Sequence, residues 1–457
     1  MTVDFLSDSD TRAVPAPSGL PRLIPAAAEV DPGVGMHLYR LGPPAHSPGA
    51  TSPGQARAII AEVQAAGLTG RGGAAFPVYR KLSAVAQATA RAGRGHSVAV
   101  ANGAEGEPDS GKDRSLLWLA PHLVLDGLQL AAAAAGAGRA VLYVHRDAAL
   151  AGHLTSVLAQ RAAAGCDPLA TELIQAPDRF LAGETSAVIS AVSGGPARPR
   201  FVLPSAWEHG IGGRPTLVQN VETLAHLALI GRFGAAWFRS AGLPGEPGSM
   251  LCTVLHADGG SYVTEAALGA PLAALLPGLR PRPGRGAAAG GQAGVQAVLV
   301  GGYHGTWLDP GRAAGLALSQ ASLRTAGATP GAGVLAELPP GRCGLAETAR
   351  VARYLALESA GQCGPCFNGL PRMAAALAEL ARPRPARAAE ADLRRWAGLV
   401  AGRGACHHPD GFVRFVASAL TVFADETARH ARGQCQATDD APFFALPAPP
   451  ATEADWS

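Results

Sequence analysis

The sequence predicts three folded parts in series: an α/β domain with a mainly parallel sheet, a small β domain and a C-terminal helical bundle. Three observations predict this division. Helical patterns alternate with short apolar strands as far as about Gly242, β-rich runs follow between Pro247 and about Gly333, and amphipathic helices continue to about Arg432. With 457 residues, 48% hydrophobic and 16% charged, the chain can bury several cores.

Composition excludes several classes of protein. The net charge of +3, from 38 basic and 35 acidic residues, leaves no electrostatic signature of nucleic-acid binding. The 58 glycines and 37 prolines follow no period, which excludes collagen and solenoid repeats. The N-terminus has acidic residues and prolines in place of a signal peptide, so we expect a cytoplasmic, reducing location.

The first two segments differ in how regular their patterns are. Residues 1–54 are punctuated by proline and glycine and predict an N-terminal arm without a core of its own. Residues 55–242 predict the α/β domain, with short apolar strands such as "HSVAVANG" and "AVLYVHR" between helical patterns. The apolar stretch from Leu123 to Val144 predicts a buried helix followed by a buried strand, because Asp126, Gln129 and Arg139 interrupt it.

The remaining segments predict the two smaller parts. Residues 247–333 contain the β-rich runs "SMLCTVLHA", "SYVTEA" and "VQAVLVGG" around the low-complexity insert "RPRPGRGAAAGGQAG", and predict a small β domain of the ubiquitin-like (β-grasp) type. Residues 340–432 predict the helical domain, because Leu345, Ala349, Ala352 and Ala356 share one helical stripe. Residues 433–457 are expected to form a tail.

The seven cysteines are candidate metal ligands or buried thiols, since disulfides are rare in a reducing compartment. Cys166 and Cys252 are isolated and predict packed thiols. Cys343 lies 20 positions before the next cysteine, too far for a compact ligand loop, and Cys435 lies near the tail. The candidate metal ligands that remain are Cys363, Cys366 and Cys406.

Two further motifs have the residue types of a nucleotide site. "GLTGRGGAAFPVYRKL" surrounds Arg71 with glycines, so that backbone amides can approach a phosphate while Arg71 and Lys81 offset its charge. "ANGAEGEPDSGKDRSLL" follows an apolar strand, at the position where open α/β sheets bind ligands. Taken alone, the first motif could be an ordinary glycine-rich turn, and the second could be a solvated loop with a helix cap.

Five motifs in series resemble the flavin-bearing 51-kilodalton component (the F subunit) of NADH:quinone oxidoreductase, respiratory complex I. The same family includes diaphorase subunits of hydrogenases and formate dehydrogenases. The motifs are "GRGGAAFP", "EGEPDSGKDR", "FLAGETSA", "GRPTLVQNVETLAHL" and "ESAGQCGPC". The resemblance runs from about residue 65 to residue 425 and implies an α/β FMN-binding domain, a ubiquitin-like domain and a helical iron–sulfur domain.

The resemblance also implies an activity: an NADH dehydrogenase-like oxidoreductase that takes hydride from NADH onto FMN and passes single electrons to a cluster and a partner. It assigns the cofactor-binding role to Gly70, Arg71, Gly72, Gly73, Phe76, Lys81, Asn102, Gly183, Asn220 and Thr223. The candidate catalytic residues, near the flavin and the dinucleotide, are Glu105, Glu107 and Glu184.

The cysteine loop departs from the family pattern E-S-C-G-x-C-x-P-C, because Ala360 replaces the first cysteine. Three thiolates can hold a 4Fe-4S cluster with another fourth ligand, or a 3Fe-4S cluster. Candidates for the fourth ligand are Ser359, His407 and His408. Buried thiols, or a zinc site of three cysteines and one histidine, are the alternatives to a cluster.

Other departures concern the electron donor. Ala104 and Thr185 stand where the family has acidic residues, and Ser205 stands where it has an aromatic side chain that stacks on the NADH adenine. Phe76 matches the other stacking aromatic, and Trp207 is a candidate substitute for the missing one. Loss of one stacking face, at roughly 1–3 kcal/mol, weakens dinucleotide binding by about 5- to 150-fold.

Three functional hypotheses follow. The first is an NADH-oxidising FMN and iron–sulfur subunit. The second keeps both cofactors but exchanges electrons with another donor or acceptor, and the third is a cofactor-poor assembly subunit; intact Lys81, Asn102, Glu184 and Asn220 count against the third. The expected partner is an iron–sulfur electron acceptor, ferredoxin-like or complex I-like, through which the chain reaches the membrane indirectly; nucleic acid is not expected.

Overall fold

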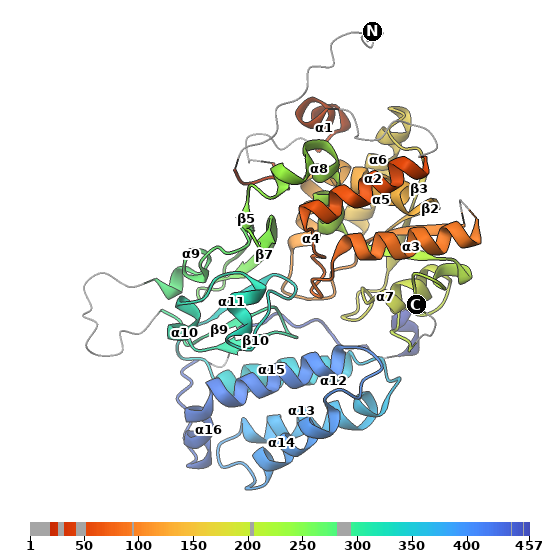
Figure 1. Cartoon of the computed structure of the whole chain (residues 1–457). Coiled ribbons are helices and arrows are strands. Elements are labelled where there is room, and N and C mark those ends of the chain that lie inside the picture. Colours follow the sequence, from red (N-terminus) through yellow and green to blue (C-terminus); the bar gives the residue numbers. More distant parts are fainter. Residues whose placement is uncertain are drawn as a thin grey trace.

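A computed structural model describes residues 19–25, 32–42, 52–93, 96–201, 205–280, 294–439, 441–450 and 452–457 (Figure 1). Much of the predicted N-terminal arm and most of the low-complexity insert lie outside the described residues. Within the described part, no single helix is long and apolar enough to span a membrane, and only one pair of helices, bent by 98°, meets that test jointly.

The first sheet has four parallel strands in the order β3-β2-β1-β4. Their bounds are β1 Ser97–Gly103, β2 Ala137–His145, β3 Thr171–Ala176 and β4 Thr216–Asn220. In register, Asn102 of β1 lies beside Tyr143 of β2 and Asn220 of β4. Asn102 and Asn220 therefore meet at the carboxyl edge of the sheet, where open parallel sheets bind ligands.

Helices cover both faces of this sheet. Their bounds are α2 Pro53–Ala66, α3 Val78–Ala92, α4 Lys112–Leu119, α5 Pro121–Ala135, α6 Ala148–Ala163, α7 Thr185–Val192 and α8 Val221–Phe238. Ala99 and Ala101 of β1 join the core beneath α5 and α8, whereas Val98 and Val100 pack on the other face against α7. Alternation along the strand therefore fixes which helices lie on each face. The predicted buried helix and the buried strand that follows it are confirmed as α5 and β2.

Helices α5 and α8 pack closely because of one glycine. A side chain on Gly127 of α5 would collide with the Leu224 carbonyl oxygen of α8 at 1.9 Å. The absence of a Cβ at this position lets the two backbones approach, and the pair forms the centre of the core beneath the sheet.

The second sheet has the strand order β10-β9-β11-β7-β8. Its strands are β7 Ser249–Leu255, β8 Ser261–Ala267, β9 Ala297–Val300, β10 Thr306–Leu308 and β11 Val334–Leu338. The connections between them contain the short helices α9 Leu272–Leu275, α10 Pro310–Ala314 and α11 Gln320–Arg324. A separate hairpin of β5 Gly242–Leu243 and β6 Glu246–Pro247 precedes the sheet. Strands β7 and β11 are parallel, and the other neighbours are antiparallel. The three β-rich runs of the sequence form β7, β8 and β9, as predicted.

Helices occupy the C-terminal part and share a core with the second sheet. Their bounds are α12 Gly344–Leu357, α13 Leu370–Leu380, α14 Ala389–Val400, α15 His408–Val422 and α16 Ala424–Ala431. Trp307 of β10, Leu345 and Phe415 belong to one buried cluster, which also takes in Phe444 of the tail. Figure 1 shows these helices, in blue, against the teal sheet.

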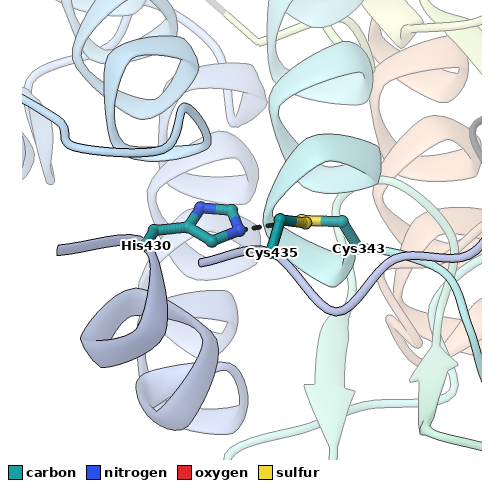
Figure 2. A group of neighbouring side chains, drawn as sticks. All are labelled: Cys343, His430 and Cys435. Carbon is teal, nitrogen blue, oxygen red and sulfur yellow. Dashed lines mark hydrogen bonds between the residues drawn. The ribbon is translucent and has the colours of Figure 1, made fainter. Parts of the chain in front are cut away.

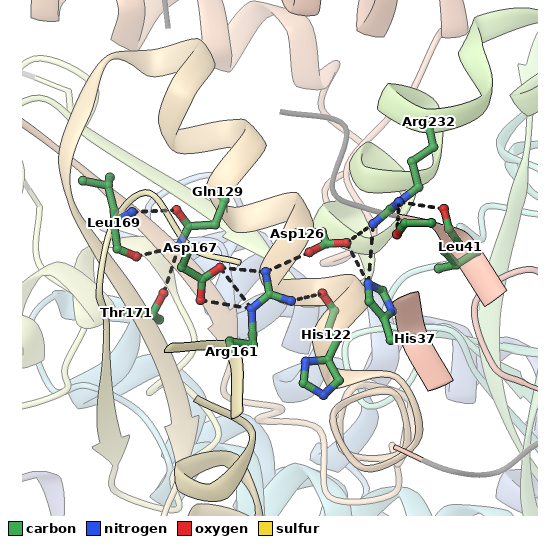
Figure 3. A network of polar contacts seen from close by, with 11 residues as sticks. His37, Leu41, His122, Asp126, Gln129, Arg161, Asp167, Leu169, Thr171 and Arg232 are labelled. Atoms are coloured by element: carbon green, nitrogen blue, oxygen red, sulfur yellow. Dashed lines mark hydrogen bonds and ion pairs between the residues drawn. The ribbon is translucent and has the colours of Figure 1, made fainter. Parts of the chain in front are cut away.

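The described part of the N-terminal segment packs on the α/β part. Helix α1, Val34–Leu41, contains no buried residue. It is held by Asp126 of α5, which hydrogen-bonds to His37 Nε2 at 2.8 Å and accepts from Arg161 Nη2 at 2.8 Å and from Arg232 (Figure 3). These charges lower the pKa of Asp126 although its burial acts in the opposite direction.

Candidate functional site

The glycine loop before α3 presents backbone amides without protein partners. The amide of Gly70 donates to the Phe76 carbonyl oxygen at 2.9 Å, and that of Arg71 donates to Thr223 Oγ1 at 2.8 Å. Among the described residues, the amides of Gly72 and Gly73 donate to none. Gly73 has φ +97°, which L side chains rarely adopt. This loop has the free donors that an anionic group needs.

The Arg71 guanidinium points into the protein. Its Nε donates to the Ser249 carbonyl oxygen at 3.0 Å and lies 4.0 Å from Glu222 Oε1, while Nη1 donates to the Thr69 carbonyl oxygen at 2.9 Å. The residue is only 5% exposed. Arg71 therefore fixes the loop against β7.

Lys81 of α3 has few commitments inside the protein. Its Nζ makes one long hydrogen bond, 3.4 Å to the Val218 carbonyl oxygen of β4. Burial lowers the pKa of Lys81, and the neighbouring Glu184 acts in the opposite direction. A half-buried ammonium with spare donors at a sheet edge is suited to bind an anion.

A buried charge network joins the sequence motifs beneath the loop. Lys112 Nζ donates to Asp113 Oδ1 at 2.6 Å and to Glu222 Oε2 at 2.9 Å. Asn220 Nδ2 donates to Asp113 Oδ2 at 2.6 Å, and Glu222 Oε1 accepts from the Leu251 amide at 2.8 Å. Glu222 was not among the sequence-predicted site residues, although it lies in the "QNVETL" motif.

Asn102 and Gly183 bring two strand-end loops together. Asn102 Nδ2 donates to the Gly183 carbonyl oxygen at 2.8 Å, and Asn102 Oδ1 accepts from the Ala104 amide at 3.2 Å. A Cβ on Gly183 would lie 2.4 Å from the Ala104 carbonyl oxygen. The glycine is required for this approach, because no side chain fits between the loops.

The three predicted catalytic glutamates lie in different environments. Glu105 accepts from the amides of Asp113 and Arg114 at the start of α4, both at 3.2 Å, and burial followed by the charge of Asp113 raises its pKa to about 7. Glu184 caps α7 by accepting from the Ser186 amide at 2.8 Å. Of these two, Glu105 is the carboxyl group poised to exchange a proton near neutral pH.

Glu107 reaches into the second sheet. Its Oε2 accepts from the Tyr303 amide at 2.8 Å, and Gly302 gives it room, since a Cβ there would lie 2.4 Å from Oε2. Its Oε1 is buried and has no partner in the described structure. Burial raises the pKa of Glu107 well above its ordinary value. An orphaned buried carboxyl oxygen is available as a hydrogen-bond partner for a ligand.

The candidate stacking aromatics are both exposed. Phe76 is 43% exposed and Trp207 is 42% exposed, while Ser205 is half-buried. Phe180, directly before "LAGET", packs instead at its ring edge against His304 and near Tyr354, with ring centroids 4.8 and 6.1 Å apart. Exposed aromatic faces are available to stack on a planar ligand.

Two of the candidate cluster cysteines lie side by side. Cys363 and Cys366 have Sγ atoms 3.7 Å apart, and Cys366 lies in a π-helical turn, Pro365–Gly369, a distortion frequent at functional sites. Burial, then the neighbouring Cys363, raises the pKa of Cys366 to about 11. The charge of Cys406 adds to this rise, so Cys406 lies within electrostatic range of Cys366.

The candidates for a fourth ligand differ in availability. Both ring nitrogens of His408 are used, by His304 Nε2 and by the Leu355 carbonyl oxygen, each at 2.9 Å. His407 is exposed and Ser359 is half-buried. Ala360 is 3% exposed, in an apolar cluster with Leu181 and Trp456 of the tail.

The cysteine loop adjoins the nucleotide loops. Glu358, directly before "SAGQC", accepts from Arg179 Nη1 at 2.9 Å and from the Phe180 amide at 3.0 Å. Burial raises the pKa of Cys406, and the nearby Glu184 carboxylate adds to this rise. The Glu184 carboxylate therefore lies within electrostatic range of both Lys81 and Cys406.

A second cysteine group was not predicted to be a site, because Cys343 is distant from the other cysteines along the chain and Cys435 lies near the tail. Cys343, His430 and Cys435 offer ligand atoms that all lie within 4.8 Å of one another (Figure 2). The sequence expectation that Cys343 and Cys435 belong to no site overlooked this contact. Folding brings α16 and the start of the tail back to the first turn of α12.

Comparisons with known proteins agree with this geometry. Residues 63–229 match a family model described as the Nuo51 FMN-binding domain, and residues 346–430 match the NADH-ubiquinone oxidoreductase-F iron-sulfur binding region. The F subunit of NADH-quinone oxidoreductase from Rickettsia bellii is 30% identical over 325 residues, which cover 68% of this chain and 75% of the relative. This chain belongs to the family of NADH-quinone oxidoreductase F subunits. The Rickettsia felis relative is 30% identical over 322 residues, covering 68% of this chain and 74% of that protein.

Solved structures give the same relationship. An NAD⁺-reducing [NiFe]-hydrogenase in the air-oxidised state matches with a TM-score of 0.72 and 30% identity, over 88% of this chain and 66% of that one. The H₂-reduced state matches with a TM-score of 0.70. The family therefore places an FMN-binding domain and an iron–sulfur binding region in this chain, and its members are oxidoreductases.

Proposed function

We propose that this chain is an electron-transfer flavoprotein subunit that oxidises NADH at FMN and delivers single electrons through an iron–sulfur cluster to a partner. The observation that carries the proposal is the position of the loop before α7: its Gly183 accepts from Asn102 at the sheet edge, and its Arg179 and Phe180 donate to Glu358 of the cysteine loop. One electron donor site and one cluster site thus adjoin, as stepwise electron transfer requires.

The residues present fit FMN. The free amides of Gly72 and Gly73 and the uncommitted Lys81 ammonium would hold the phosphate, while Asn102 and Asn220 at the sheet edge would orient the ring system. The remaining residues that shape this site are Gly70, Arg71, Phe76, Gly183 and Thr223. Bound FMN would supply the conversion from two-electron to one-electron transfer.

The proposed NADH site consists of acidic side chains and exposed aromatic rings. The orphaned Oε1 of Glu107 is a free hydrogen-bond partner for dinucleotide hydroxyls, and Glu105 holds or releases a proton near pH 7. Phe76 offers one stacking face, and Ser205 offers none. This favours weaker NADH binding than in a relative with two aromatics, and it keeps a donor other than NADH as the second candidate.

For the cluster, we assign Cys363, Cys366 and Cys406 as ligands. His408 is committed to protein partners, which leaves Ser359 and His407 as protein candidates for the fourth position. A cluster with three thiolates and a weaker fourth ligand should lose one iron readily, giving a 3Fe-4S form from a 4Fe-4S one.

The finer domain assignment follows from the strand order. Numbered within the second sheet, the order β8-β7-β11-β9-β10 is 2-1-5-3-4 with its first and last strands parallel, which supports a ubiquitin-like (β-grasp) domain at 247–333 extended through β11. Helices α12 to α16 support a helical iron–sulfur domain at 340–432. The FMN domain is assigned to 55–242.

The partner is assigned by chemistry. A cluster that releases single electrons needs an iron–sulfur acceptor within reach, either a ferredoxin-like protein or a component of a larger complex. Membrane association would then come through that partner.

Anaerobic reconstitution with FMN tests the proposal. The protein should remain yellow after desalting, and NADH should bleach the flavin absorbance. Protein that retains no chromophore would refute the flavin site, whereas retained flavin that millimolar NADH leaves oxidised would favour the donor other than NADH.

A further inference from the structure

We propose that Cys343, Cys435 and His430 bind a Zn²⁺ ion at a site separate from the iron–sulfur cysteines. Cys343 Sγ lies 3.7 Å from His430 Nε2, and the three ligand atoms all lie within 4.8 Å of one another. Around tetrahedral zinc, bonds of about 2.3 Å to sulfur and about 2.0–2.1 Å to nitrogen place ligand atoms roughly 3.6–3.8 Å apart. The observed spacing is close to that geometry.

The orientation of His430 fits a metal ligand. Its Nδ1 lies 3.3 Å from the Leu380 carbonyl oxygen, which can only accept a hydrogen bond. The ring proton therefore sits on Nδ1, and in the neutral ring the lone pair of Nε2 faces Cys343. A backbone carbonyl that fixes the tautomer in this way is typical of metal-binding histidines.

The two cysteines occupy complementary positions. Cys343 is buried at the N-cap of α12, where its Sγ accepts from the Ala346 amide at 3.4 Å. Burial and the nearby Glu426 raise the pKa of this thiol to about 12, so the metal would have to displace its proton on binding. Cys435 is exposed and gives an ion access from solvent. Glu426, one helical turn before His430 on α16, has Oε2 3.5 Å from Cys343 Sγ. Glu426 Oε2 also accepts from the Leu345 amide at 3.2 Å and lies outside the group of three close ligand atoms, so the fourth position falls to water.

The site lies at the far end of α12 from the cysteine loop. Cys343 precedes this 14-residue helix, and Cys363 follows it, so about 21 Å of helix separates the two groups. A zinc ion here would tie α12, α16 and the start of the tail together. Such an ion would stabilise the fold and would not transfer electrons, because zinc has no redox chemistry.

Metal analysis of anaerobically purified, iron-loaded full-length protein tests the site. We expect about one zinc per chain in addition to iron. Cys435→Ser, at an exposed position, should lower zinc retention against a competing chelator by roughly tenfold or more while the iron content stays constant. Cys363→Ser is the matched variant, and it should lower iron while zinc is retained.

The test compares which metal each variant loses: Cys435→Ser should lose only zinc, and Cys363→Ser should lose only iron. If Cys435→Ser retains zinc, or if zinc is lost from Cys363→Ser instead, the ion belongs to the other cysteines and the proposal is wrong. Absence of zinc together with a Cys343–Cys435 disulfide, seen as a mass about 2 Da lower before reduction, would also overturn it. Failure of FMN to bind leaves this result unaffected, because zinc is counted separately.

Discussion

Arg179 donates a hydrogen bond from Nη1 to Glu358 Oε1 over 2.9 Å and thereby ties the loop before α7 to the loop that carries the cysteines. The Glu358 side chain is 1% exposed, and its other oxygen accepts from the Phe180 amide. The contact holds two loops that must stay close for electrons to pass between flavin and cluster.

Glu358→Ala should destabilise the protein, because it removes the only anion that pairs with Arg179 in the described structure and leaves the Phe180 amide without its acceptor, while Arg179 keeps the Ala448 carbonyl oxygen. We expect a loss of about 3–5 kcal/mol in the unfolding free energy measured with urea. Glu390→Ala is the control, since Glu390 pairs with Arg394 on the surface of α14 and such pairs contribute about 0.3–0.5 kcal/mol. Equal losses of unfolding free energy in the two variants would contradict a stabilising role for the buried Glu358 contacts.

Lys81→Ala should weaken FMN binding. Loss of a hydrogen-bonded charge costs about 1.5–3 kcal/mol, or about 10- to 150-fold in the FMN dissociation constant measured by fluorescence quenching. Arg80→Ala removes the exposed neighbouring cation on the same helix and should leave the constant unchanged. If both variants raise the FMN dissociation constant equally, Lys81 acts only through the net positive charge of this helix and makes no direct contact with the phosphate.

Gly183→Ala should abolish or strongly weaken FMN retention, because the new Cβ would lie 2.4 Å from the Ala104 carbonyl oxygen and force the two loops apart. Gly152→Ala on α6 meets nothing within 4 Å and should stabilise the protein by up to about 1 kcal/mol. Flavin content after desalting measures the difference. Normal flavin content in Gly183→Ala would show that the loops separate without cost.

Asp126→Asn should destabilise the protein in a pH-dependent way. The folded-state pKa of Asp126 lies below the unfolded value of about 3.9, so its charge stabilises the fold above that pH and less as the pH falls below it. The difference in urea midpoint between wild type and Asp126→Asn should therefore be constant near pH 7 and shrink below about pH 4. A difference that persists undiminished in acid would contradict the ionic role.

Ala360→Cys should make the iron content more resistant to air, because a fourth thiolate would hold the labile iron. The new side chain must displace part of the apolar contact with Leu181 and Trp456. Iron and sulfide analysis before and after oxidation measures the effect. An unchanged iron count would indicate that a protein group such as Ser359 or His407 already holds the fourth iron.

Local pattern was enough to predict most of the fold. Strand alternation and helical stripes predicted the parallel sheet, the β-rich runs and the stripe of α12, because each depends on neighbouring residues. Strand order within the second sheet depends on long-range pairing, such as β7 with β11, which no local signal contains.

The site was predictable where it follows motifs and was missed where it depends on tertiary contact. Asn102 and Asn220 were assigned from the family motifs, and they lie side by side near the carboxyl ends of two neighbouring strands. The inward turn of the Arg71 guanidinium and its contact with Glu222 require knowledge of β7, and the approach of Cys435 to Cys343 spans 92 positions of chain.

The most direct test of electron transfer in this protein is an anaerobic NADH titration of the reconstituted protein, with flavin absorbance and electron paramagnetic resonance recorded on the same samples. We predict that the flavin bleaches and that a cluster signal appears in parallel, and that Cys363→Ser keeps the bleaching but loses the signal. A flavin that bleaches without any cluster signal in the iron-loaded wild type would contradict electron transfer from FMN to the site of Cys363, Cys366 and Cys406.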